Sequence, residues 1–175
     1  MSVKRGRMAA RSGLYGEDVA EALISQVLPI CSFSDWNETI VFPIAVKQYP
    51  TPHPYRPEKK RAGKNDFMLF GFDGFRIFMQ VKNQEVGGTT DEKLSFTFDI
   101  ARFAITDTPY SEYWLVLLGK YWATQPGLLE YCQRKCREFE MLIDGTRRNV
   151  SARVIVGPIE LAHCLNNQTM LDTNR

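Results

Sequence analysis

The feature that most constrains the fold is a pair of apolar runs joined by a short turn, DFMLFGFDGFRIFMQVK, over residues 66–82. Asp73-Gly74 between two apolar runs is a strong signal for a β-hairpin. Both arms are apolar at almost every position, so neither face of the hairpin suits contact with water. The stretch therefore predicts two central strands of a sheet that is covered on both sides.

Helices and further strands are expected on either side of this hairpin. Apolar residues recur at helical spacing in GEDVAEALISQVL, and a strand is expected in ETIVFPIAVKQY. The hairpin is followed by a predicted helix near residue 90, a buried strand in YWLVLLG, an amphipathic helix in QPGLLEYCQRKCREFEML, a strand in ARVIVG and a helix in PIELAHCLNN. This order predicts an α/β protein with a mixed central sheet flanked by helices.

The length of 175 residues predicts a single domain, residues 16–175, preceded by a basic N-terminal arm, residues 1–15. The arm carries Lys4, Arg5, Arg7 and Arg11 without an acid among them. No apolar stretch is long enough to span a membrane, and no secretory signal is visible. The four cysteines form no CxxC pair. These features favour an intracellular, cytoplasmic protein with reduced thiols.

Polar residues stand at the open end of the predicted hairpin. Asp66 begins the first arm, and Gln80 and Lys82 end the second, so the hairpin brings them together. A carboxylate and an amide oxygen can hold Mg²⁺, and a lysine beside such an ion can position or activate a water that attacks phosphorus. The structural alternatives are a turn or cap role for Asp66, a core amide for Gln80, and a strand-end lysine that reaches water for Lys82.

The length of the turn decides whether these side chains share a face. A two-residue turn at residues 73–74 would place Asp66 opposite Val81, on the wrong face of the sheet. A three-residue loop at residues 72–74, with its glycine left-handed, places Asp66 opposite Gln80. A shift of the strand register by one residue moves every side chain of the strand to the opposite face of the sheet. A functional site therefore requires the three-residue loop or an equivalent bulge.

The pattern Asp66…Gln80-Val81-Lys82 resembles the PD-(D/E)xK nuclease superfamily, in which Asp, then Glu or Asp, then Lys form the core of the site. The QxK form is similar to the methyl-directed restriction endonuclease branch. Asn65 stands where the name-giving proline would be. The resemblance covers roughly residues 16–119 and implies a restriction endonuclease-like αβββαβ core, which agrees with the order of elements above.

The resemblance implies a Mg²⁺-dependent DNA endonuclease, with Mn²⁺ as a substitute, that hydrolyses phosphodiester bonds and leaves a 5′-phosphate. Asp66, Gln80 and the Val81 carbonyl would bind the metal, and Lys82 would orient or deprotonate the attacking water. Because Gln80 is neutral, a glutamate of the first helix is expected to complete the site. Glu21 is the first choice as catalytic residue and metal ligand, and the glutamate one turn earlier, Glu17, is the second.

DNA is the expected partner, and a double-strand cut would require a homodimer or two binding events. Basic clusters suit a phosphate backbone, although a solvated segment is the alternative. Thr89 and Thr90 either contact phosphate or cap the helix that follows them. The candidate DNA-binding residues are Arg56, Lys59, Lys60, Arg61, Lys64, Thr89, Thr90 and Lys93.

Two other functions remain open at this point. One is a structure-selective recombination or junction nuclease that shares the same site. The other is a DNA-binding module whose nuclease site has decayed, with Gln80 as the mark of that decay.

Overall fold

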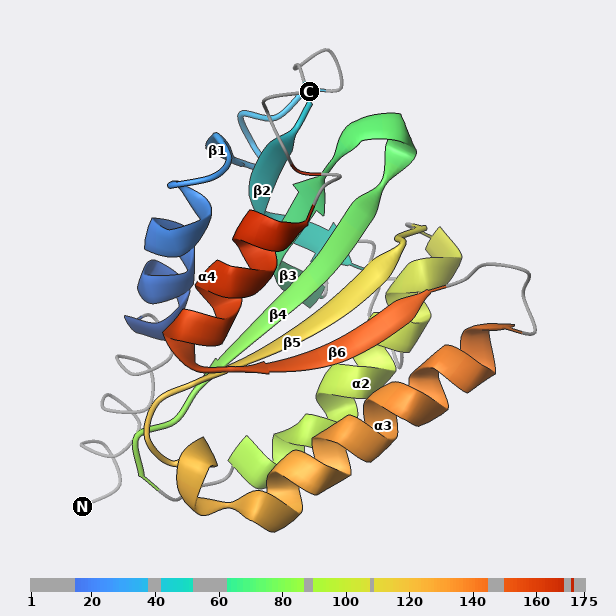
Figure 1. Ribbon diagram of the computed structural model, residues 1–175. Coiled ribbons are helices and arrows are strands. Elements are labelled where there is room, and N and C mark those ends of the chain that lie inside the picture. The colour runs from blue at the N-terminus through green and yellow to red at the C-terminus, as the bar shows by residue number, and fades with distance from the viewer. Residues whose placement is uncertain are drawn as a thin grey trace.

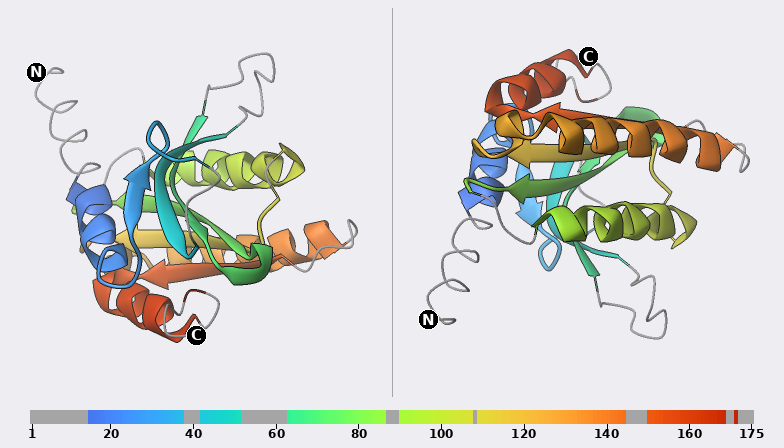
Figure 2. Two further views of the ribbon diagram at one scale, coloured as in Figure 1. Left: turned by 90° about the horizontal axis from the view of Figure 1, so that it is seen from above. Right: turned by 90° about the horizontal axis from the view of Figure 1, so that it is seen from below.

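Helices cover both faces of one sheet and give the molecule three layers (Figures 1 and 2). This arrangement confirms the predicted α/β class with a mixed sheet flanked by helices. The computed structural model describes residues 15–37, 42–51, 63–86, 90–107, 109–144, 150–168 and 171.

The sheet has six strands in the described part of the chain, and their order in space is their order in the sequence. β2, β3 and β4 are antiparallel neighbours, β1 pairs parallel with β2, and β5 and β6 continue parallel from β4. The strands are β1 (Ile30–Ser32), β2 (Ile44–Thr51), β3 (Gly63–Phe70), β4 (Arg76–Asn83), β5 (Glu112–Leu118) and β6 (Ser151–Val156).

Among the residues that the structure describes, two helices cover each face of the sheet. Parallel neighbours require crossover connections, which α2 (Thr90–Asp107) and α3 (Pro126–Asp144) supply on one face, over Phe78. Helical residues 15–24 and α4 (Gly157–Asn167) cover the other face, over Met79. Successive residues of a strand point to opposite faces, so each strand contributes to both cores.

The hairpin of β3 and β4 occupies the centre of the sheet, as the sequence predicted. Residues 67–70 and 77–81 are buried throughout. The strands are third and fourth in the order of six, so helices lie over both of their faces. Burial on both sides explains why these arms lack the alternation of apolar and polar residues that one solvated face would require.

Two features of the sheet differ from the prediction. β1 was not predicted, because three residues are too few to show a periodic pattern. β2 runs on through Pro50 to Thr51, two residues beyond the stretch ETIVFPIAVKQY in which a strand was expected. The predicted start of that strand at residues 38–41 lies outside the described residues, as does the basic arm up to residue 14.

The described helices include none that is both long enough and apolar enough to cross a membrane. All four cysteines are free thiols, and Cys132 and Cys136 lie on the buried face of α3.

Candidate active site

The turn between β3 and β4 is a three-residue loop. Residues 72–74 form one 3-10 turn whose last two residues are left-handed, with φ angles of 54° and 75°. Aspartate and glycine are among the residues that adopt this conformation most readily. The Gly71 N–H donates to the Phe75 carbonyl at 2.8 Å and closes the loop. The predicted loop length is therefore confirmed.

This loop sets the register of the hairpin. The ladder pairs Phe67 with Met79, and one further step places Asp66 opposite Gln80. Lys82 lies two residues beyond Gln80 and therefore points to the same face. The structure thus satisfies the condition that the sequence imposed on a functional site.

Asp66 and Lys82 meet at the point where the ladder ends. The Asp66 Oδ2 accepts a hydrogen bond from the Val81 N–H at 2.6 Å, so a carboxylate replaces the backbone acceptor that the next rung would supply. The Lys82 Nζ lies 4.0 Å from the same Oδ2 and donates to the Val81 carbonyl at 3.3 Å. Both side chains are largely but not fully buried. An acid and a lysine from two strands are therefore held together within reach of solvent.

Gln80 has a different environment from the one predicted for a metal ligand. Its side chain is 3% exposed, and its Oε1 accepts a hydrogen bond from the Tyr113 hydroxyl at 2.9 Å. Burial raises the pKa of Tyr113 well above its usual value, so the phenol stays protonated and donates. The amide oxygen is thus directed into the core beneath α2 and α3. This contact matches the alternative of a core amide, so we do not include Gln80 among the candidate metal ligands.

The first helix begins directly against the end of β4. A Cβ on Gly16 would lie 2.3 Å from the Asn83 Cβ, so this approach requires glycine. The next residue, Glu17, is half-buried. Burial raises the pKa of the Glu17 carboxyl, and the Asp66 carboxylate raises it further, while the Lys82 ammonium opposes the shift. Glu17 is therefore within electrostatic reach of both.

Glu21, one turn later, is engaged elsewhere. Its Oε2 forms an ion pair with the Lys47 Nζ of β2. We therefore favour Glu17 over Glu21 as the helix acid of the candidate site, because Glu21 is paired with Lys47 and the pKa of Glu17 responds to Asp66. Lys47 was not predicted, although a lone lysine in the strand IAVKQY is the same kind of signal as Lys82. We call Glu17, Glu21, Lys47, Asp66 and Lys82 the charged cluster.

The strand ends beside the charged cluster are held by a buried tryptophan. The Trp122 indole N–H donates to the Leu118 carbonyl at 2.8 Å and to the Lys82 carbonyl at 3.3 Å. The Gln84 N–H also donates to the Leu118 carbonyl at 2.9 Å. The first helix, α2 and α3 all start at this edge of the sheet (Figure 1). Helix N-termini carry partial positive charge, so the edge suits an anion.

The candidate DNA-binding residues are only partly described. Lys64 lies in β3 and pairs with Pro50, and Thr90 is the first residue of α2. Lys93 is exposed in the first turn of that helix. Arg56, Lys59, Lys60, Arg61 and Thr89 lie outside the described residues.

The donor atoms of the charged cluster suit a hard cation. Mg²⁺ prefers oxygen ligands and usually retains several waters, so one or two protein carboxylates suffice. The Asp66 and Glu17 carboxylates are ligands of this kind. The Val81 carbonyl is a further oxygen near Asp66, because the Lys82 ammonium contacts both of them. A cation would also relieve the repulsion that contributes to the raised pKa of Glu17. The described residues contain no group of three or more His, Cys, Asp or Glu side chains that could hold a metal, so any such site depends on water and backbone oxygens as well.

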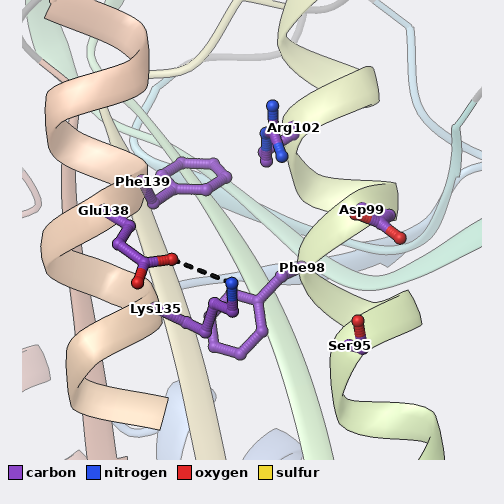
Figure 3. Close-up of a pocket in the computed structure, with 7 residues that line it drawn as sticks. All are labelled: Ser95, Phe98, Asp99, Arg102, Lys135, Glu138 and Phe139. Atoms are coloured by element: carbon purple, nitrogen blue, oxygen red, sulfur yellow. Dashed lines mark hydrogen bonds and ion pairs between the residues drawn. The ribbon is translucent and has the colours of Figure 1, made fainter. Parts of the chain in front are cut away.

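A second group of charged side chains lines a hollow between α2 and α3 (Figure 3). Lys135 donates to Glu138 at 2.8 Å across one helical turn. The volume is about 40 Å³, room for a few water molecules at roughly 10–15 Å³ each, so the hollow is too small for a nucleotide-sized substrate. Its lining residues are Ser95, Phe98, Asp99, Arg102, Lys135, Glu138 and Phe139.

Comparison of the chain with protein-family models, with curated proteins and with solved structures finds no match in any of the three. The sequence motif and the geometry of the charged cluster therefore carry the functional assignment.

Proposed function

We propose that the protein is a Mg²⁺-dependent DNA endonuclease of the restriction endonuclease-like, PD-(D/E)xK type, which hydrolyses phosphodiester bonds and leaves a 5′-phosphate. The observation that carries the proposal is the Lys82 Nζ at 4.0 Å from the Asp66 Oδ2, at the open end of a buried hairpin. The order of first helix, β2, β3, β4, α2 and β5 supports it, because it follows the αβββαβ core of that superfamily.

The residues of the cluster would divide the chemistry between them. Asp66, Glu17 and the Val81 carbonyl would hold Mg²⁺. When bound, Mg²⁺ supplies positive charge that offsets the negative charge developing on the phosphate oxygens. The Lys82 Nζ would hydrogen-bond the attacking water. As an amine it would accept the proton of that water, and as an ammonium it would orient the water and offset charge on the phosphate.

A polyanionic substrate agrees with the surroundings of the cluster. Three helix N-termini point toward this edge of the sheet. The sequence adds a basic arm and a basic segment, residues 56–64, directly ahead of Asp66. The described part of the chain contains one such cluster, so a double-strand cut would require a second copy of the chain or a second binding event.

The proposal is tested by nicking of supercoiled plasmid in the presence of Mg²⁺ or Mn²⁺ and of EDTA. The purified protein should nick only with the divalent ion. Lys82→Ala should lower the rate by about 10²–10⁴-fold, the usual loss when a positioned proton-transfer group is removed, and leave DNA binding largely intact. Lys135→Ala on α3, outside the charged cluster, is the matched control and should nick like the wild type.

The outcome also separates the two alternative functions. DNA binding without any metal-dependent nicking would indicate a decayed nuclease that serves as a binding module. Preferential cutting of four-way junctions over linear duplex would indicate a structure-selective recombination nuclease. A Lys82→Ala protein that nicks within a few-fold of the wild type would refute the assignment of the site.

A further inference from the structure

Lys47 is an unusual residue for its position in the sheet. Its neighbour on the same face, Ala45, and its cross-strand partner, Phe67, are both buried in the core beneath the first helix. The Lys47 side chain is only 31% exposed. Holding a long charged side chain in one partly buried position costs conformational entropy, and a smaller apolar residue would avoid that cost.

Stability alone is a weak reason for a lysine at this position. Ion pairs with solvent-exposed groups typically contribute about 0–1 kcal/mol, and the Lys47 and Glu21 side chains, 31% and 34% exposed, still reach solvent. The position of the pair is more informative. Glu21 lies one helical turn after Glu17, so a contact that holds Glu21 also sets the rotation of the helix face that carries Glu17.

Lys47 also acts on the balance of charge. The cluster sets three carboxylates, Glu17, Glu21 and Asp66, against the ammonium groups of Lys47 and Lys82. The Lys47 ammonium forms an ion pair with the Glu21 carboxylate. Glu17, which follows the close approach of Gly16 to Asn83 at the end of β4, is the helix carboxylate outside this ion pair.

We propose that Lys47 is a positioning residue of the active site: its ion pair with Glu21 fixes the first helix so that Glu17, which follows Gly16, is held at the end of β4 where Lys82 lies. The role is distinct from that of Lys82, because Lys47 acts through the helix and does not touch the reacting atoms. The proposal rests on the proposed nuclease function, and it adds a second lysine, from a different strand, to the residues that build the site.

The test compares Lys47→Met and Glu21→Gln with the wild type in steady-state cleavage of a DNA substrate. Both variants break the ion pair, and both should lower kcat by about 10–100-fold, the usual effect of removing a group that orients a ligand. KM for DNA should stay unchanged, and the Mg²⁺ concentration that gives half-maximal rate should rise. Lys47→Arg keeps the charge and should recover most of the activity.

A matched control is available on α3, where Lys135 and Glu138 form an ion pair of the same chemistry outside the charged cluster. Lys135→Met should cleave like the wild type. A kcat for Lys47→Met within twofold of the wild type, or a loss that Lys47→Arg does not recover, would overturn the proposal.

Hydrogen exchange of the amides in residues 15–24 provides a measurement that does not depend on activity. Lys47→Met should exchange faster in this helix than the wild type, because the contact that holds it is lost. Unchanged exchange would overturn the positioning role. A wild-type protein that fails to cleave DNA would overturn the proposed function and the catalytic part of this inference, while the exchange result would still decide whether Lys47 holds the helix.

Discussion

The charged cluster and the hollow between α2 and α3 contain the same kinds of side chain but are assembled differently. Lys135 and Glu138 of the hollow lie three residues apart on one helix, where helix geometry alone brings them together. The cluster draws its five residues from the first helix, β2, β3 and β4. Folding of the whole domain is therefore needed to assemble it.

The electrostatic outcome also differs between the two regions. The hydrogen bond from Lys135 lowers the pKa of the exposed Glu138 carboxyl, so its charge is favoured. Burial raises the pKa of Glu17, and Asp66 adds to the effect, so its charge is disfavoured. A partly buried carboxylate with a raised pKa, beside a second carboxylate and a lysine, is typical of functional sites. The charges of Lys135 and Glu138 offset each other. In the charged cluster, Glu17 and Asp66 repel each other, and a bound cation would relieve this repulsion.

Asp66→Asn should have the largest effect and would sharpen this contrast. Nicking activity should fall by at least about 100-fold, since loss of a charged metal ligand removes several kcal/mol of transition-state stabilisation. Calorimetry should show weaker Mg²⁺ binding. The same change at Asp99, in the hollow, should leave both quantities unaltered; an unchanged Mg²⁺ affinity in Asp66→Asn would place the metal elsewhere.

Glu17→Gln should separate activity from stability. The rate should fall by about 10–100-fold, as for other groups that bind or orient a metal. Because the folded-state pKa is raised, the stability that Glu17 contributes is fully present below its usual value of 4.5 and is lost as the pH rises through the folded-state value.

Glutamine mimics the neutral carboxyl, so Glu17→Gln should raise Tm at pH 7. The rise should not exceed about 2–4 °C, the shift that 1 kcal/mol produces in a domain of this size. The difference should vanish near pH 4. Thermal unfolding of both proteins across this pH range checks the prediction, and a lower Tm for the variant at pH 7 would contradict it.

Tyr113→Phe should reduce stability without a comparable loss of catalysis. The Gln80 Oε1 would lose its donor, and an unsatisfied buried acceptor costs about 1–3 kcal/mol. Denaturant unfolding measures the change, with Tyr131→Phe on the half-buried side of α3 as the control. A loss of cleavage in Tyr113→Phe that exceeds the loss of stability would return Gln80 to the catalytic residues.

Glu138→Gln should have the smallest effect. It removes an exposed partner of Lys135, and neither the rate of nicking nor Tm should change measurably. A loss of activity here would break the comparison, because the hollow would then share in the function.

The sequence by itself determined the central hairpin. Two apolar arms around Asp73-Gly74 specified adjacent buried strands, and the demand that Asp66 and Lys82 share a face selected the loop length that is observed. These are local relations, since a hairpin turn sets its own register. The helices after residue 90 were likewise readable from periodicity and from their start signals.

Only the tertiary structure decided which side chains lie near Asp66 and Lys82. Gly16 packs directly against Asn83 and so brings Glu17 to the end of β4, whereas Glu21 pairs with Lys47. The orientation of Gln80 depends on the Tyr113 hydroxyl, from a strand that only a crossover helix brings alongside. Such contacts join residues distant in sequence through packing, which periodicity and turn chemistry do not encode, because those signals report only on neighbours along the chain.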